Sequence, residues 1–184
     1  SGMGCGDHWP LCNGHLFPPL DDIGTVIEWS HRLVATLVAA LVVALAVYAW
    51  RLRHDARRVA YAALALLVLQ VLLGAVTVKL ALPPWTVILH LATAMLLLAT
   101  LLVAARPHSL APSPLLILAF VTVLFGALTA NLGAAAACTG FPLCNGQLWP
   151  SAGGLALVQW VHRLLAYALA LYALVWAVRT PGRW

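Results

Sequence analysis

Residues 60–82, AYAALALLVLQVLLGAVTVKLAL, decide the fold class of this chain. The stretch carries one charged side chain, that of Lys79, and is about as long as a helix must be to cross a hydrocarbon core of about 30 Å. In lipid each backbone N–H and C=O has to be satisfied within its own segment, so we expect one continuous helix here. The segment is therefore predicted to span a membrane.

Four further apolar blocks surround this one, at residues 24–50, 85–105, 114–136 and 154–178. Across the chain 64% of the residues are apolar and 8% are charged, whereas a soluble domain carries about 25% charged residues. The alternating pattern of a membrane barrel is absent from the sequence. The sequence thus predicts an all-α integral membrane protein with five transmembrane helices, and it excludes a soluble fold.

The net charge of +5 follows a topological pattern. Arginines gather in alternate connections between the blocks, at Arg51, Arg53, Arg57, Arg58, Arg106, Arg179 and Arg183. Arginine-rich connections face the cytoplasm in membrane proteins, so the other connections face outward. We expect a multi-pass protein of the cell membrane, and the charge gives no reason to expect nucleic acid binding.

All four cysteines lie in the connections predicted to face outward, where thiols are oxidised. The natural pairing is Cys5 with Cys12 and Cys138 with Cys144. A metal site at the first pair, joined by His8 and His15, is the alternative. It is disfavoured because the second pair has no nearby histidine and the spacing is not a zinc pattern.

The two cysteine pairs belong to an internal repeat. CGDHWPLCNGHLFP from Cys5 is followed by EWSHR from Glu28, and CTGFPLCNGQLWP from Cys138 is followed by QWVHR from Gln159. Two copies of one membrane unit are the simplest account, and we divide them into halves at residues 1–105 and 106–184. Each copy lacks a helix or a histidine that the other one has, so we expect the sequence to be truncated at both ends.

Three histidines, His31, His90 and His162, lie within apolar segments, where an ionisable residue is a functional candidate. His31 and His90 each follow the outer start of a helix by about six or seven residues, which places both about 10 Å below the helix ends. Two imidazoles at one level can ligate a heme iron from both sides. Hydrogen bonds to neighbouring helices are the alternative.

Arg32 and Arg163 follow two of these histidines directly, near the outer face and against the positive-inside bias. Guanidinium groups suit carboxylates, so we predict that both bind heme propionates. Snorkelling to lipid headgroups is the alternative.

Glu28 lies one helical turn outward of His31 on the same face, and Gln159 takes its place in the second copy. A carboxylate can exchange protons and an amide of similar shape cannot, so we predict that the first site performs chemistry and that Glu28 is catalytic. An ion pair with Arg32, or stabilisation of the helix start, is the alternative. Gly74-Ala-Val-Thr77 and Gly126-Ala-Leu-Thr129 also echo each other, and helix packing explains them better than close approach of a flat macrocycle.

The stretches CGDHWPLCNG, EWSHR, LQVLLGAVTV, LPPW before His90, ACTGFPLCNG and QWVHR, in this order and spacing, resemble heme A synthase over essentially the whole chain. The resemblance implies an eight-helix protein of two pseudo-symmetric four-helix-bundle halves, of which this chain would hold the second to sixth helices. Members of the family oxidise a porphyrin methyl group of heme O to the formyl group of heme A, for use in terminal oxidases.

The resemblance also implies roles for single residues. His31 and His90 would flank the substrate heme O beside Glu28, and His162 would ligate a heme b in the second half. The two cysteine pairs would match outer-loop disulfides of the family. A heme O synthase (a farnesyltransferase) and oxidase assembly factors would be partners.

Two other functions share some of these features. A non-enzymatic diheme b-type electron-transfer protein would have the same histidines, with Glu28 then structural. A thiol–disulfide membrane protein would use the outer cysteines, but neither pair is a C-x-x-C motif and the three histidines would be left unexplained.

Overall fold

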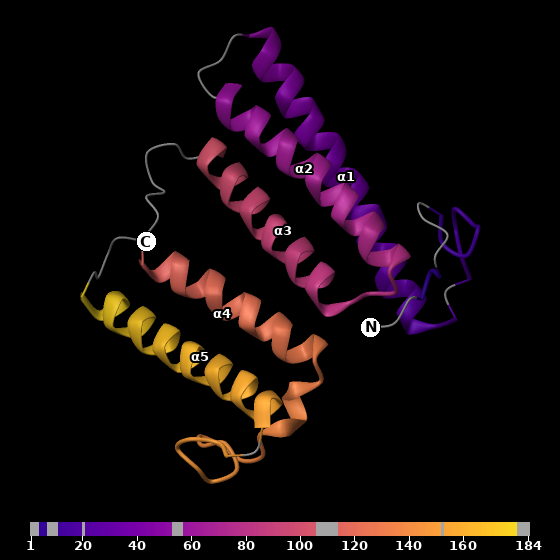
Figure 1. Ribbon diagram of the computed structural model, residues 1–184. Helices are drawn as coiled ribbons and strands as arrows, with labels where there is room; N and C mark the ends of the chain where they lie inside the picture. Colours follow the sequence, from indigo (N-terminus) through magenta and orange to yellow (C-terminus); the bar gives the residue numbers. More distant parts are fainter. Residues whose placement is uncertain are drawn as a thin grey trace. The chain divides into compact units, whose positions relative to one another are not determined.

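The computed structural model describes residues 4–6, 11–19, 21–52, 57–105, 114–151 and 153–179. These ranges hold five helices that are long and apolar enough to cross a membrane, and no strand (Figure 1). The predicted all-α membrane fold is confirmed. The chain divides into two units, Ser1–Ser109 and Leu110–Trp184, which are described separately. Four residues used in the sequence analysis lie outside the described ranges: His8, Arg53, Arg106 and Arg183.

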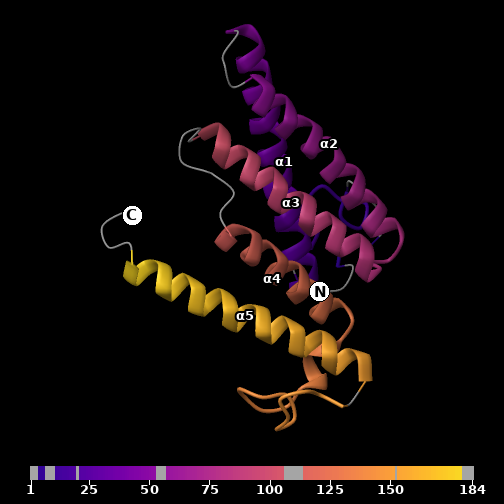
Figure 2. The ribbon, with the colours of Figure 1, turned by 60° about the vertical axis from the view of Figure 1, so that its left-hand side comes forward.

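The first unit consists of the helices α1 (Ile23–Arg51), α2 (Arg57–Lys79) and α3 (Pro84–Ala105). Helix α2 packs against both α1 and α3 (Figures 1 and 2). Among the described residues no Cα atom of α1 lies within 8 Å of a Cα atom of α3. Helix α2 is therefore the common support of the two helices that carry His31 and His90.

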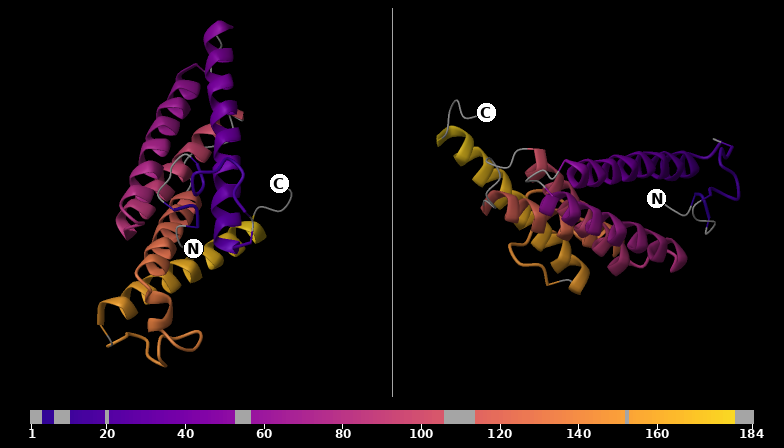
Figure 3. Two further views of the ribbon diagram at one scale, coloured as in Figure 1. Left: turned by 90° about the vertical axis from the view of Figure 1, so that its right-hand side faces the viewer. Right: turned by 90° about the horizontal axis from the view of Figure 1, so that it is seen from above.

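The three helices meet in an apolar cluster formed by Val42 of α1, Ala63 and Leu67 of α2, and Leu97 of α3. The cluster lies well below the histidines, toward the Arg-rich ends of the helices. Figure 3 shows α1 diverging from α2 away from this cluster, toward the end where α1 begins. Large apolar side chains such as Leu37 and Leu41, each 60% exposed, cover the outer surface of α1, as lipid contact requires.

Two helix ends differ from the predicted ones. Helix α2 ends at Lys79 because Ala81 and Leu82 take left-handed φ angles of 58° and 62° and donate their N–H groups to carbonyls of the last turn. This is the Schellman closure, which ends a helix. Helix α4 ends at Asn131 because Gly133, with a φ of 68°, closes it in the same left-handed region.

The second unit is an antiparallel pair, α4 (Pro114–Asn131) and α5 (Gly153–Arg179), joined through the short 3-10 helix η1 (Ala134–Ala137) and the second cysteine loop (Figure 1). A small core of Cys138, Cys144, Ala156 and Trp160 holds this loop against the start of α5. In both units a cysteine loop thus precedes a long helix that carries a histidine.

Candidate functional site

Both predicted disulfides are present, Cys5 with Cys12 and Cys138 with Cys144. The bridged sulfur atoms cannot act as thiolate ligands. The described part of the chain also holds no group of three potential metal ligands. The alternative of a metal site at the first cysteine pair is therefore disfavoured for the cysteines and His15, while His8 lies outside the described residues.

The two cysteine loops share a turn in their described residues. In each, the Asn and Gly after the second cysteine take left-handed conformations, with φ angles of 50° and 79° at Asn13 and Gly14 and of 55° and 74° at Asn145 and Gly146. The asparagine amide then donates to the carbonyl of the residue before the first cysteine, at 3.1 Å in both loops. The repeated PLCNG sequence therefore encodes one turn, in which Asn and Gly are favoured because both central φ angles are positive.

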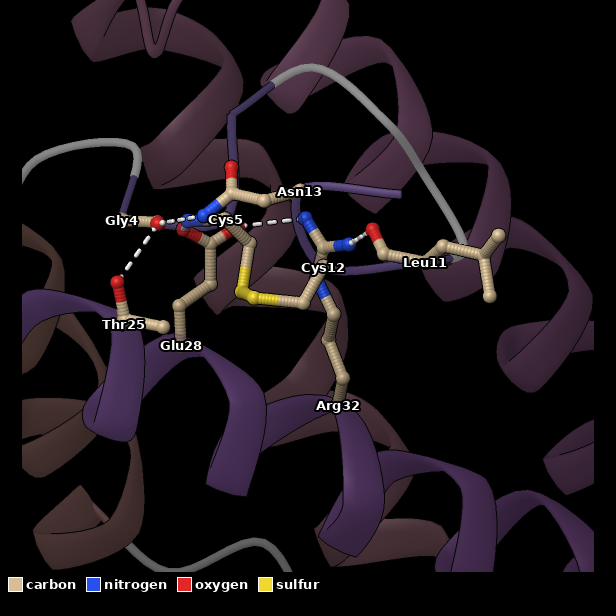
Figure 4. Close-up of polar contacts among 8 residues, drawn as sticks. All are labelled: Gly4, Cys5, Leu11, Cys12, Asn13, Thr25, Glu28 and Arg32. Atoms are coloured by element: carbon tan, nitrogen blue, oxygen red, sulfur yellow. Dashed lines mark hydrogen bonds and ion pairs between the residues drawn. A yellow bond between two sulfur atoms is a disulfide. The ribbon is translucent and has the colours of Figure 1, made fainter. Parts of the chain in front are cut away.

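Arginine side chains fasten these loops to the helices. Arg32 donates to the carbonyl of Leu11 at 2.5 Å (Figure 4). Arg163 donates to the equivalent carbonyl of Leu143 at 2.8 Å and to those of Gly140 and Cys138 at 2.7 and 3.0 Å. This docking role was not predicted from the sequence, although the joint repetition of PLCNG and HR is a signal for it. Binding of propionates by these arginines stays a prediction.

Glu28 links the helix, the arginine and the disulfide loop (Figure 4). Its Oε1 accepts a hydrogen bond from Arg32 Nη2 at 2.6 Å, and its Oε2 accepts one from the backbone N–H of Cys5 at 2.9 Å. The predicted i,i+4 ion pair is thus present. The helix start is capped by Asp22 instead, which accepts from the Thr25 N–H at 2.9 Å.

The second unit has no equivalent of this carboxylate. Gln159 takes the place of Glu28, and its Oε1 is buried with no hydrogen-bond partner among the described residues. The first cysteine loop is therefore hydrogen-bonded to a carboxylate of the following helix, and the second cysteine loop has no such carboxylate. The carboxylate is also the only one of the two groups that can take up a proton near a histidine.

The first unit carries both predicted ligands of the first heme. His31 lies one turn further into α1 than Glu28 and is exposed, and His90 is half-buried on α3. Helices α1 and α3 both pack against α2 and make no close backbone contact with each other among the described residues. A meeting of the two imidazoles stays a prediction.

The imidazole of His90 packs against a glycine of the preceding helix. A Cβ atom at Gly74 of α2 would lie 3.1 Å from Cε1 of His90. Gln70, one turn before Gly74, places its amide nitrogen 3.2 Å from Nε2 of the ring. The other ring nitrogen, Nδ1, is buried and has no partner among the described residues.

The second unit has the same close contact between a histidine and a glycine of the preceding helix. A Cβ atom at Gly126 of α4 would lie 2.9 Å from Cε1 of His162 on α5, and Nδ1 of His162 is also buried without a partner in the described residues. The matching GAVT and GALT stretches are thus explained by the approach of an imidazole to a glycine. The interpretation as general helix packing was too coarse, since it overlooked that each glycine precedes a histidine helix.

The donor type of these histidines suits a heme, because an imidazole nitrogen is a common axial ligand of heme iron. Nδ1 of both His90 and His162 is buried beside a glycine without a hydrogen-bond partner among the described residues, which costs about 1–3 kcal/mol. The chemistry of the donors therefore agrees with the heme that the sequence predicts.

The chain is similar in sequence to known proteins over its whole length. The sequence profile of a family described as cytochrome oxidase assembly protein (COX15-CtaA) matches residues 1–183. The heme A synthase of Alkalihalophilus pseudofirmus is 35% identical to this chain over 204 residues, which cover 100% of the chain and 69% of that protein. The heme A synthases of Shouchella clausii and Halalkalibacterium halodurans are 35% and 34% identical and are matched over 68% of their length. The similarity extends over both units.

Proposed function

The chain belongs to the heme A synthase family of cytochrome oxidase assembly proteins, and from this premise we propose how its residues serve heme A synthesis. It is a multi-pass membrane enzyme of heme A synthesis. The reaction that we propose is the oxidation of a porphyrin methyl group of heme O to a formyl group.

The first unit is proposed to bind the substrate heme O between His31 and His90. The observation that carries this proposal is the placement of His31 on α1 and His90 on α3, two helices that both pack against α2 and make no close backbone contact with each other. The apolar cluster of Val42, Ala63, Leu67 and Leu97 closes the unit below them. A porphyrin held here would rest on apolar side chains and meet polar groups on its outer side.

Glu28 is proposed as the proton acceptor of the reaction. Conversion of a methyl to a formyl group adds one oxygen atom and passes four electrons to an external oxidant, and with water as the oxygen source it also releases four protons. A proton acceptor near the substrate would assist these steps. Glu28 stands one turn from His31, and its bonds to Arg32 and to the Cys5 N–H keep the carboxylate in place. An oriented carboxylate beside the substrate serves this role better than one that is free to rotate.

The second unit is proposed to hold a resident heme b at His162. When bound, this group would supply one-electron transfer. The chain would contribute the imidazole of His162, which packs against Gly126. Gln159 stands where the first unit has the carboxylate of Glu28, and an amide is not a proton acceptor. Arg32 and Arg163, beside the cysteine loops, are proposed to bind propionates.

The proposed orientation puts the cysteine loops outside the cell membrane and the Arg-rich connections in the cytoplasm. Heme O would then reach the first unit from a farnesyltransferase that produces it, and heme A would pass to oxidase assembly factors. Both partners are proposed from the family resemblance alone.

The function is tested in cells that make heme O but no heme A of their own. Pigments extracted after expression of this chain should contain heme A, and those after expression of His90→Ala should not. The heme spectrum of the second unit should persist in His90→Ala, which shows that the variant has folded. If the wild-type chain binds both hemes and never yields heme A, the electron-transfer alternative replaces the enzyme.

A further inference from the structure

Two large apolar side chains of the first cysteine loop are exposed, and the proposed function does not use them. Leu16 is 69% exposed and Phe17 is 74% exposed, and they follow the turn at Asn13 and Gly14. Removal of such side chains from water is favourable in proportion to their apolar area. Their position on α1 indicates what covers them.

The segment of Leu16 and Phe17 lies along the side of α1 at the level of Trp29. The indole Nε1–H of Trp29 donates to the carbonyl of Leu16 at 3.0 Å, and the Phe17 ring meets the indole in an edge arrangement with ring centroids 6.0 Å apart. Trp29 lies about 9 Å along the axis from the helix start at Ile23, at a rise of about 1.5 Å per residue. The loop therefore folds back over the first turns of α1.

Trp29 lies where α1 enters the membrane. Helix α1 has 29 residues and is about 43 Å long, which exceeds a hydrocarbon core of about 30 Å. Arg51 at the inner end belongs outside the core, and a span of about 20 residues counted back from it begins close to Trp29. Leu33 and Leu37 follow Trp29 at intervals of four residues on the same face and are exposed, as lipid contact requires. Phe17 is thus at the boundary of the core, beside a face of α1 suited to lipid.

The backbone of this segment suits an environment with little water. Pro18 and Pro19 have no N–H group, and the carbonyl of Leu16 is satisfied by Trp29. The remaining backbone groups can bind water in the polar headgroup layer, which lies outside the hydrocarbon core. Insertion of the segment at this level therefore leaves few hydrogen-bonding groups without a partner.

The second cysteine loop is not held in this way. Trp160 corresponds to Trp29 in the repeat, but it is buried in the small core beneath its loop, and its Nε1–H has no partner among the described residues. Leu148 and Trp149, the counterparts of the exposed pair, therefore lack the hydrogen bond that fastens the first pair to its helix. The two loops share a turn and differ in the segment that follows it.

We propose that Leu16 and Phe17 form a lipid anchor, which inserts beside Trp29 at the membrane surface where α1 begins and holds the first cysteine loop against the bilayer. Its partner is the boundary between lipid headgroups and acyl chains, which takes up aromatic and aliphatic side chains. The anchor is specific to the unit whose cysteine loop donates a hydrogen bond to Glu28. It goes beyond the proposed function, because it does not depend on heme.

The test places a nitroxide label at Leu16→Cys or, as the matched control, at Leu148→Cys, in the full chain in lipid nanodiscs. Power-saturation EPR compares collisions of the label with oxygen, which concentrates in lipid, and with a water-soluble nickel chelate. The ratio of oxygen to nickel collisions should be higher at position 16 than at position 148. Equal ratios would overturn the anchor, and so would a label at position 16 that neither reagent reaches, because protein would then cover it.

A second comparison tests the role of Trp29. Trp29→Phe keeps an aromatic ring for Phe17 and removes the N–H that holds the carbonyl of Leu16, so the collision ratio at position 16 should shift toward that of a label in water. Trp160→Phe is the matched change and should leave the label at position 16 unaltered. The Cys5–Cys12 disulfide, checked by mass spectrometry, shows that the loop has closed in each variant. An unchanged ratio in Trp29→Phe would overturn the fastening of the anchor by the indole.

Discussion

His90 of α3 rests on Gly74 of α2 so closely that a Cβ atom at position 74 would lie 3.1 Å from Cε1 of the imidazole. The same relationship holds between His162 and Gly126, at 2.9 Å. A distance this short is tighter than ordinary van der Waals contact, so any larger residue must displace the ring. In both helix pairs, α2 with α3 and α4 with α5, only glycine therefore leaves room for the histidine at the point where the two helices cross.

Replacement of Gly74 by alanine should displace His90 and weaken heme binding in the first unit. Overpacking of this kind costs about 1–3 kcal/mol, and the strain falls on the ligand. The fraction of low-spin heme in the absorption and EPR spectra measures the effect. Gly154→Ala on α5 is the control, because a Cβ atom there meets nothing within 4 Å. Equal spectra for the two variants would show that the contact between Gly74 and His90 does not affect heme binding.

Glu28→Gln should abolish heme A formation while heme O stays bound. The amide retains an oxygen that can accept the Cys5 N–H, so the loop keeps one of its contacts, but it cannot take up a proton. Extracted pigments report the product, and the absorption spectrum reports the bound substrate. Gln159→Glu in the second unit is the matched change and should not raise the yield. Undiminished conversion by Glu28→Gln would remove Glu28 from the mechanism.

Arg163→Lys should loosen the second cysteine loop. The guanidinium group donates to the carbonyls of Cys138, Gly140 and Leu143, and an ammonium group on a flexible stem cannot reproduce this fork. The free energy of local opening should fall by about 1–3 kcal/mol, measured as faster amide hydrogen exchange in residues 138–147. Arg179→Lys, at the exposed end of α5, should leave exchange in the loop unaltered.

Removal of the two disulfides should have unequal effects on conversion. Cys5 donates its backbone N–H to Glu28, whereas Oε1 of Gln159 is buried without a hydrogen-bond partner among the described residues. Double serine variants of Cys5 and Cys12 should therefore lose more heme A formation than those of Cys138 and Cys144. The yield of heme A per bound heme O decides the comparison, and equal losses would contradict a link from the first disulfide to Glu28.

The orientation in the membrane can be read from labelling of new thiols. A cysteine in place of Leu148, which is 78% exposed in the second cysteine loop, should react with an impermeant maleimide in intact cells. A cysteine in place of Arg58, at the start of α2, should react only after the cells are permeabilised. The reverse pattern would invert the proposed topology.

Much of the architecture was accessible from local sequence. Apolar blocks of spanning length predicted five helices, and the repeated cysteine motifs predicted both disulfides. Helix ends were less accessible because apolar residues continue past them: α2 stops at Lys79 through left-handed residues such as Ala81, which has no special propensity for that conformation. The docking of the loops by Arg32 and Arg163 was missed, since long-range bonds to backbone carbonyls leave no mark on composition.

The sequence by itself determined that this chain spans a membrane, that its cysteine loops are cross-linked, and which histidines and which carboxylate are candidates for chemistry. These conclusions follow from properties of single segments: length, polarity and repetition. Only the tertiary structure decided that Gly74 and Gly126 seat the histidines, that Gln70 and Thr93 bond to His90, and that Glu28 is tied to the backbone of Cys5. Such contacts depend on the rotation and the register of one helix against another, which packing sets and which no single helix encodes alone.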